Sequence, residues 1–269
     1  MDIPLGKFSP YADGYDRSLL APMSRADARR DIGLTEALSF RGADVWRGYE
    51  FSWLGARGKP EVAGIRLEVN ADSPYFVESK SLKLYLNGFA QTRFDSATEV
   101  WGVINRDLGT AFGAPVRFEL LPLEALAEIM GVLAGDCIDD LEISTDVYAR
   151  EPAFLTVSDR SRVVEESLVS HLFRSLCPVT GQPDWASVLI RYRGPEIDRT
   201  GLLKYLISFR SHPAFHETTI EQIWLDMKAQ LGCEALTVLG CFQRRGGLDI
   251  NPVRTDFEVE PVLPRLPRQ

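Results

Sequence analysis

The stretch LYLNGFAQTRFDSATEVWGVINRDLG, at residues 84–109, decides the fold, because a related stretch occurs later in the chain. Residues 204–232 read KYLISFRSHPAFHETTIEQIWLDMKAQLG. Aromatic and apolar residues recur in the same order in both stretches, and the alignment ends with Gly109 matching Gly232. Recurrence over this length predicts two similar structural units.

Strand-like segments flank each copy. They are rich in β-branched and other apolar residues, which is typical of strands. They lie at 64–69 and 114–121 around the first copy, and at 187–193 and 235–242 around the second.

Each copy itself is expected to form two helices. In the second copy, apolar residues at helical spacing follow Asp198 or Thr200, either of which can cap the first helix, and Gly232 can end the second helix. A unit would then run strand–strand–helix–helix–strand–strand, which gives an α+β fold with antiparallel sheets backed by helix pairs. We place the first unit, with an N-terminal extension, at 1–150 and the second at 151–269.

Composition restricts the class of protein. The chain has 269 residues, 45% of them hydrophobic and 25% charged, and a net charge of -8. This excludes a disorder-dominated chain, and the acidic balance disfavours nucleic acid as a partner. No apolar run is long enough to span a membrane, and the start lacks a secretory signal. We therefore expect a cytoplasmic protein that acts on a small molecule.

The cysteines and histidines do not form a metal motif. The chain has four cysteines and three histidines, with neither a CxxC pair nor HExxH. We expect no metal, and we expect reduced thiols in a protein without an export signal. Structural roles, as small buried side chains, are assigned to Cys137, Cys233 and Cys241.

A first candidate segment is FVESKSLKLYL, at residues 76–86. Glu78, Ser79, Lys80 and Lys83 lie at the start of a predicted helix. Backbone N–H groups at a helix N-terminus, together with Ser79 and Lys80, could hold a phosphate group. The alternative is an ordinary helix start capped by Ser or Glu.

A second candidate segment is SLCPVTGQPDW, at residues 175–185. Proline and glycine place Cys177 in a constrained loop, and Asp184 lies seven residues further on. A thiol and a nearby carboxyl group are candidates for a nucleophile and an acid. To donate a proton near neutral pH, Asp184 needs a pKa above its usual value of about 3.9, which burial against an aromatic side chain can provide.

Two further segments could bind ligands. In HPAFHETT, residues 212–219, His216 and Glu217 open a predicted helix, and a carboxylate there can accept paired hydrogen bonds from a guanine-like edge. A helix-capping Glu is the alternative. In RRGGLDINPVR, which starts at residue 244, Arg245 and Gly246 would let the backbone approach an anion beside a fixed positive charge.

Taken together, ESKSLKLYL, CPVTGQPDW, the His–Glu pair and RRGGLDINP resemble the NADPH-dependent 7-cyano-7-deazaguanine reductases of queuosine biosynthesis (QueF) in their two-unit form. The resemblance covers most of residues 60–258. It implies tandem tunnelling-fold units, assembly as a homodimer, and reduction of a nitrile to a primary amine with two NADPH.

The resemblance also implies roles for individual residues. Cys177 would attack the nitrile carbon to form a covalent thioimide, Asp184 would protonate the nitrile nitrogen, and His216 would assist proton transfer. Contacts with the base are implied for Val77, Glu78, Ser79, His216 and Glu217. Contacts with NADPH are implied for Ser79, Lys80, Arg245 and Gly246.

Two alternatives remain open at this point. One is a thiol-dependent nitrile hydrolase, in which water rather than hydride attacks the thioimide. The other is a non-catalytic protein that binds a purine or a pterin. The residues predicted to bind NADPH favour the reductase, because a hydrolase has no use for them.

Overall fold

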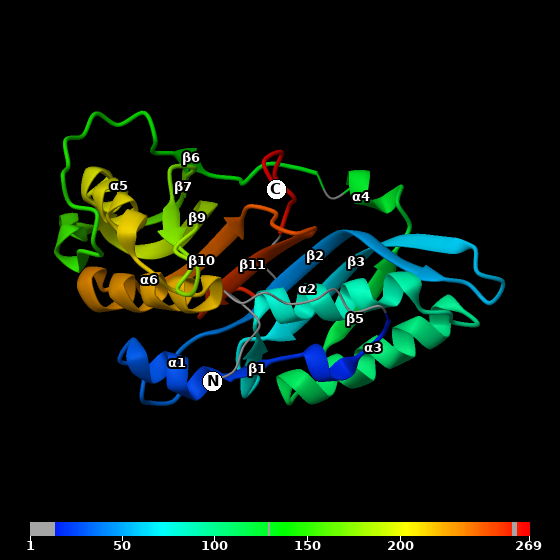
Figure 1. Ribbon diagram of the computed structural model, residues 1–269. Helices are drawn as coiled ribbons and strands as arrows, with labels where there is room; N and C mark the ends of the chain where they lie inside the picture. Colours follow the sequence, from blue (N-terminus) through cyan, green and yellow to red (C-terminus); the bar gives the residue numbers. More distant parts are fainter. Residues whose placement is uncertain (1–13, 129, 260–262) are drawn as a thin grey trace. The chain divides into compact units, whose positions relative to one another are not determined.

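The computed structural model describes residues 14–128, 130–259 and 263–269, and these form two compact units (Figure 1). The first unit comprises Ala43–Met130, Arg244–Ile250 and the described residues up to Ala37. The second comprises Leu38–Gly42, Gly131–Gln243 and Asn251–Gln269. A single boundary at residue 150 does not describe this division, because the chain returns to the first unit at Arg244 after it has built most of the second.

The first unit pairs an antiparallel sheet with two helices. Three strands, β2 (Arg41–Leu54), β3 (Pro60–Asn70) and β5 (Arg117–Leu121), pair in the order β5-β3-β2. The helices are α2 (Ser79–Gly88) and α3 (Ala97–Phe112). The shorter elements are η1 (Arg17–Leu19), β1 (Pro22–Ser24), α1 (Arg25–Asp31), β4 (Tyr75–Val77), η2 (Phe89–Gln91) and α4 (Ala125–Glu128).

The second unit repeats this plan with more strands. Its sheet is formed by β7 (Val157–Ser170), β9 (Pro183–Ile197), β10 (Ala235–Phe242) and the part of β11 (Leu248–Thr255) that begins at Asn251, with antiparallel pairing throughout these strands. The helices α5 (Arg199–Ser208) and α6 (His216–Leu231) lie together beside β9 and β10 (Figure 1). The short elements are β6 (Asp136–Cys137), η3 (Pro152–Phe154), β8 (Arg174–Leu176) and η4 (Phe209–Ser211).

The predicted α+β class with antiparallel sheets and helix pairs is confirmed. The predicted fourth strand occurs only in the second copy, as β11. After β5 the first copy continues into the short helix α4 instead, and its residues Ala125, Leu126 and Glu128 are good helix formers.

The duplication is visible in matching contacts within the two helix pairs. The first helix has 10 residues and the second 16 in both copies. The Tyr85 hydroxyl donates to Asp107 Oδ2 at 3.0 Å, and the Tyr205 hydroxyl donates to Asp226 Oδ2 at 2.6 Å. These equivalent pairs hold the two helices of each copy together.

The predicted helix caps are confirmed in the second copy, and one alignment is wrong in the first. Asp198 caps α5 by accepting from the backbone N–H of Thr200, and Gly232 ends α6 in the left-handed conformation. The equivalent of Gly232 is Gly113, with the same φ of 67°, whereas Gly109 lies inside α3. Apolar spacing does not distinguish two glycines one helical turn apart, but only the true end needs φ > 0.

The cysteines are partly as predicted. All four are free, and Cys233 and Cys241 are buried, whereas Cys137 is exposed and the prediction of a buried side chain is wrong for it. Within the described residues, no helix has both the length and the apolar character needed to cross a membrane.

Candidate active site

The β8–β9 hairpin presents Cys177 at its turn. The Cys177 N–H donates to the Gln182 carbonyl at 2.8 Å, and the Gly181 N–H donates back to the Cys177 carbonyl at 3.0 Å. Gly181 has φ 67°, which closes this tight loop. The residue is 7% exposed, so the thiol is largely shielded from water. The loop position predicted for Cys177 is confirmed.

Backbone hydrogen bonds bring this hairpin to the start of α6. The Leu176 N–H donates to the His212 carbonyl at 3.0 Å, and the Ala214 N–H donates to the Leu176 carbonyl at 3.1 Å. Cys177 therefore follows directly after a residue that is held against the segment leading into α6.

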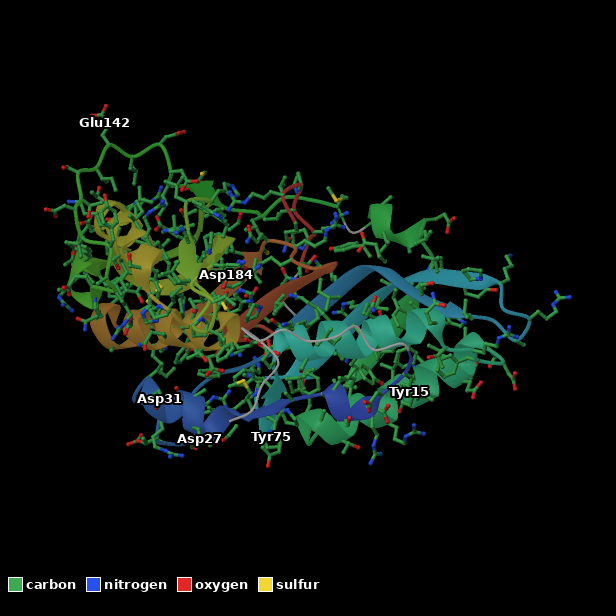
Figure 2. All side chains as sticks on the ribbon, viewed as in Figure 1. Tyr15, Asp27, Asp31, Tyr75, Glu142 and Asp184 are labelled. Atoms are coloured by element: carbon green, nitrogen blue, oxygen red, sulfur yellow. The ribbon has the colours of Figure 1, made fainter. Side chains whose placement is uncertain are left out.

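Asp184 and His216 meet at this junction. Asp184 lies on β9, is 3% exposed and sits among the packed side chains of the second unit (Figure 2). Its Oδ2 atom is 3.4 Å from His216 Nε2. The His216 ring stacks on Phe242 at a centroid distance of 3.9 Å, which fixes its orientation.

Glu217 occupies the first turn of α6 and is buried. The partial positive charge of the helix N-terminus stabilises a carboxylate at this position. The N-cap residue Phe215 makes no side-chain hydrogen bond to the helix, whereas Glu78, Ser96 and Asp198 cap α2, α3 and α5. The N-cap position of α6 is therefore occupied by Phe215, and Glu217 lies two residues later, in the first turn.

The start of α2 is built differently from the predicted phosphate seat. Glu78 Oε1 accepts from the Lys80 N–H at 2.7 Å, and Oε2 accepts from the Ser81 N–H at 2.8 Å. These two amides are thus already occupied by a protein carboxylate. Glu78 is 0% exposed and Val77 is 1% exposed, so both side chains are buried. Ser79 and Lys80 keep partly exposed side chains.

The RRGG segment forms a tight turn. The Arg245 N–H donates to the Leu248 carbonyl at 2.9 Å, with Gly246 at φ 59° and Gly247 at φ 85° between them. Positive φ at both central residues is the type I′ geometry that favours Gly-Gly. A Cβ atom at Gly246 would lie 3.1 Å from Lys83 Cδ, so glycine lets this turn approach α2 closely.

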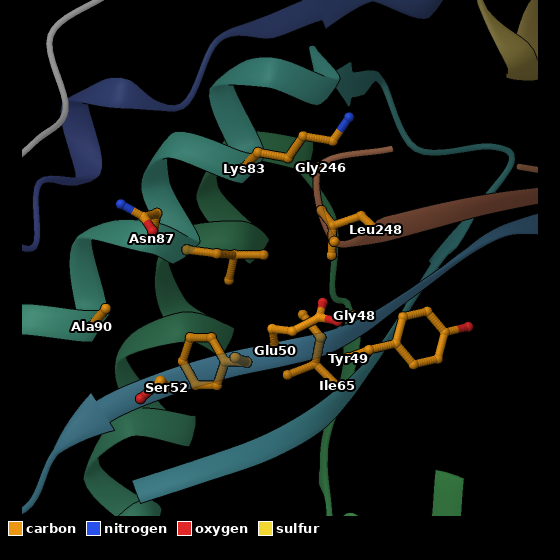
Figure 3. Close-up of a pocket in the computed structure, with 13 residues that line it drawn as sticks. Gly48, Tyr49, Glu50, Ser52, Ile65, Lys83, Asn87, Ala90, Gly246 and Leu248 are labelled. Atoms are coloured by element: carbon orange, nitrogen blue, oxygen red, sulfur yellow. The ribbon is translucent and has the colours of Figure 1, made fainter. Parts of the chain in front are cut away.

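A cavity of about 280 Å³ opens between this turn, α2 and β2 in the first unit (Figure 3). Lys83 and Asn87 line it from α2, and Glu50 and Ser52 line it from β2 (Figure 3). Its size is just below the 300–1,000 Å³ of pockets that hold a whole drug-sized ligand. Glycine backbone beside a lysine stem suits an anionic group, so the residues present fit part of a nucleotide such as NADPH.

A Gly-x-Pro-acid pattern that occurs twice in the sequence could also have pointed to the site. The β2–β3 hairpin contains Gly58-Lys59-Pro60-Glu61, and the β8–β9 hairpin contains Gly181-Gln182-Pro183-Asp184. Leu54 pairs with Pro60 as Leu176 pairs with Pro183, so the two hairpins are structural equivalents. This shared pattern extends the repeat into the catalytic candidates. The stacking partner Phe242 has no comparable signal, whereas Lys83 was part of the first candidate segment.

The described residues contain no group of three or more His, Cys, Asp or Glu side chains that could hold a metal ion. They bring together Cys177, Asp184, His216 and Glu217 around the start of α6 in the second unit. In the first unit they bring Gly246 to Lys83, while Ser79 and Lys80 lie at the start of α2.

Comparisons with known proteins point in one direction. The family described as "Nitrile reductase, 7-cyano-7-deazaguanine-reductase N-term" matches residues 11–120, and "QueF-like protein" matches residues 183–260. An NADPH-dependent 7-cyano-7-deazaguanine reductase of Burkholderia multivorans is 51% identical over 255 residues, covering 94% of this chain and 93% of that protein. One of Burkholderia cenocepacia is 51% identical over 257 residues with the same coverage. A solved structure of the archaeosine synthase QueF-Like in its apo form aligns with 36% of this chain and 96% of its own chain. The sequence identity is 20% and the TM-score is 0.31.

Proposed function

Because the chain belongs to the NADPH-dependent 7-cyano-7-deazaguanine reductase family, we propose that it reduces the nitrile group of 7-cyano-7-deazaguanine to a primary amine. The product is 7-aminomethyl-7-deazaguanine, in queuosine biosynthesis. The reaction takes four electrons, delivered as two hydrides, and two protons. What supports the proposal most is the cluster of Cys177, Asp184 and His216 on connected elements of one unit.

The first step is the addition of Cys177 to the substrate. Its Sγ atom forms a bond to the nitrile carbon, one π bond of the nitrile becomes a lone pair on nitrogen, and the product is a covalent thioimide. The thiol loses one proton and the nitrogen gains one, so the addition is balanced. Covalent attachment divides one difficult reduction into easier steps and holds the reactive carbon in place.

We assign the supply of that proton to Asp184. His216 Nε2, 3.4 Å from Asp184 Oδ2, can pass a proton between Asp184 and its surroundings. The stacking of His216 on Phe242 keeps the imidazole in reach of the carboxyl group.

Glu217 is the group that we expect to bind the base. A guanine-like edge presents two parallel N–H donors, and a carboxylate at a helix N-terminus accepts both. Val77, Glu78 and Ser79, at the start of α2, would also contact the base.

NADPH, when bound, supplies the two hydrides. Lys80 and Arg245 would neutralise its phosphate charge, and Ser79 would add a hydroxyl donor. Gly246 would let the turn backbone approach the cofactor closely, which a Cβ atom would prevent.

The assembly and location belong to the same proposal. We expect a homodimer in the cytoplasm, because tunnelling-fold units commonly join into barrels and because NADPH reduction of a free base needs no export. Light scattering of the purified chain tests the dimer, and a mass corresponding to one chain would contradict it.

The decisive experiment is intact-protein mass spectrometry after mixing the protein with 7-cyano-7-deazaguanine in the absence of NADPH. A covalent increase equal to the substrate mass is expected in the wild-type protein and should be missing in Cys177→Ala. The equivalent residue in the first unit is Gly55, so Gly55→Ala serves as a matched control that should still form the adduct.

Adding NADPH then separates the alternatives. Loss of NADPH absorbance together with formation of the amine supports the reductase. Product formation without loss of absorbance would indicate a nitrile hydrolase, and binding without an adduct would indicate a purine- or pterin-binding protein.

A further inference from the structure

Ser175 carries a buried hydroxyl group that has no hydrogen-bond partner among the described residues. Its side chain is 0% exposed, and no described residue forms a hydrogen bond with its Oγ atom. A buried hydroxyl without a partner costs free energy, so each such group in a native protein calls for an explanation.

The strand register places this hydroxyl among the groups to which we assign chemistry. Ser175 lies directly opposite Asp184 in the β8–β9 pair, where opposed Cα atoms are about 4.5–5.5 Å apart. Cys177 follows two residues later, at the start of the loop that joins these two strands. All three residues are buried.

The equivalent position in the first unit strengthens the case. There Trp53 lies opposite Glu61 and buries a large indole ring, leaving 6% of the residue exposed. The second unit has a small polar side chain at the same place on the same framework. Packing alone explains Trp53, but packing alone does not explain an unsatisfied hydroxyl beside Asp184.

We propose that the Ser175 hydroxyl donates a hydrogen bond to the nitrile nitrogen of the substrate as Cys177 Sγ bonds to the nitrile carbon. This inference rests on the proposed function. Negative charge develops on the nitrogen when the π bond opens, and Asp184 then transfers a proton to it. Ser175 keeps its own proton and stabilises the developing charge, as donors in an oxyanion hole do.

The test is the rate at which Ser175→Ala forms the covalent adduct with 7-cyano-7-deazaguanine, followed by rapid quenching and intact-protein mass spectrometry. Loss of one such donor should slow adduct formation by about 100-fold. Binding of 7-deazaguanine, which has no nitrile group, should be unchanged by calorimetry. The melting temperature should not fall, because the hydroxyl has no protein partner to lose.

Ser187→Ala is the matched control. Ser187 is equally buried on β9, but its Oγ atom is 2.8 Å from His171 Nδ1, so its hydroxyl has a protein partner. This variant should have a lower melting temperature and should form the adduct at the wild-type rate.

Several results would overturn the proposal. One is a wild-type rate in Ser175→Ala, and another is a fall in melting temperature with an unchanged rate, which would make the hydroxyl structural. Weaker binding of 7-deazaguanine would place the contact on the base rather than on the nitrile. Failure of the wild-type protein to form any adduct would instead contradict the proposed function, so the two failures can be told apart.

Discussion

The β2–β3 hairpin of the first unit and the β8–β9 hairpin of the second share one backbone framework. The Leu54 N–H donates to the Thr92 carbonyl at 3.0 Å, just as the Leu176 N–H donates to the His212 carbonyl. In both copies the next residue closes a short loop, and it is Gly55 in the first and Cys177 in the second.

The side chains on this shared framework differ at each position that the proposed chemistry uses. Trp53, Gly55 and Glu61 of the first copy correspond to Ser175, Cys177 and Asp184 of the second. At the start of the long helix, Ala97 and Thr98 correspond to His216 and Glu217. The same framework therefore occurs twice, and the residues for which we propose catalytic and base-binding roles lie on the hairpin and the long helix of the second unit.

The largest difference between the two units should appear in the rate of thioimide formation when Asp184 or its equivalent in the first unit, Glu61, is changed. Asp184→Asn removes the proton donor and should slow thioimide formation by about 100- to 10,000-fold, the usual contribution of a general acid. Binding of the base should persist, because Glu217 is intact. Glu61→Gln, at the equivalent exposed position, should leave the rate unchanged. Stopped-flow measurement of adduct formation checks both variants, and an unaffected Asp184→Asn would remove Asp184 from the mechanism.

A somewhat smaller effect is expected at the paired helix starts. Glu217→Ala should weaken substrate binding by about 2–5 kcal/mol, or roughly 30- to 4,000-fold in Kd, because a charged pair of hydrogen bonds is lost. Thr98→Ala changes the equivalent residue of α3 and should have no effect on Kd. Calorimetry with the substrate and without NADPH measures both constants, and an unchanged Kd for Glu217→Ala would exclude it as the anchor of the base.

The Tyr–Asp hydrogen bonds within the two helix pairs should instead contribute equally to stability in both units. Burial and a neighbouring carboxylate raise the pKa of Tyr85 and of Tyr205, so both hydroxyls stay protonated and keep donating to their Asp partners. Tyr85→Phe and Tyr205→Phe should each lower the free energy of unfolding by about 1.5–3 kcal/mol, the usual contribution of a hydrogen bond to a charged group. Urea unfolding measures both, and a much larger loss in one unit would show that the two pairs are not equivalent.

The sequence predicted most of the helices and strands, but it predicted less well where helices end and which unit each segment joins. Apolar periodicity and caps such as Asp198 predicted the helix pairs, because these signals are local. The end of α3 at Gly113 was not predicted, since a helix end depends on φ and two glycines fitted the pattern. The assignment of Arg244–Ile250 to the first unit is a tertiary result that local pattern does not contain.

The candidate site shows the same limits. The sequence motifs pointed to Cys177 and Asp184. For the segment that contains Glu78 they left two alternatives, a phosphate site or an ordinary capped helix start, and in the structure the Glu78 carboxylate caps α2. Ser175 carries no motif of its own, because an unpartnered hydroxyl can be recognised only when burial and neighbours are known.

The smallest predicted effect is on the pH dependence of stability, and it concerns His212, which lies shortly before the long helix α6. His212 in the second copy corresponds to Thr92 in the first, since each ends a short 3₁₀ turn and accepts a strand N–H. Burial lowers the pKa of His212, and the charge of Arg150 lowers it further, while Asp226 opposes both.

The sign of the resulting pH dependence follows from these shifts. As pH falls below about 6.5, the unfolded chain binds a proton on this imidazole and the folded chain does not, so stability is lost until the folded pKa is reached. His212→Thr, which installs the residue of the first copy, should therefore reduce the fall in unfolding free energy between pH 7.5 and 5.5. Urea unfolding at the two pH values measures this fall, and an unchanged fall would mean that His212 is protonated as readily in the folded protein as in the unfolded chain.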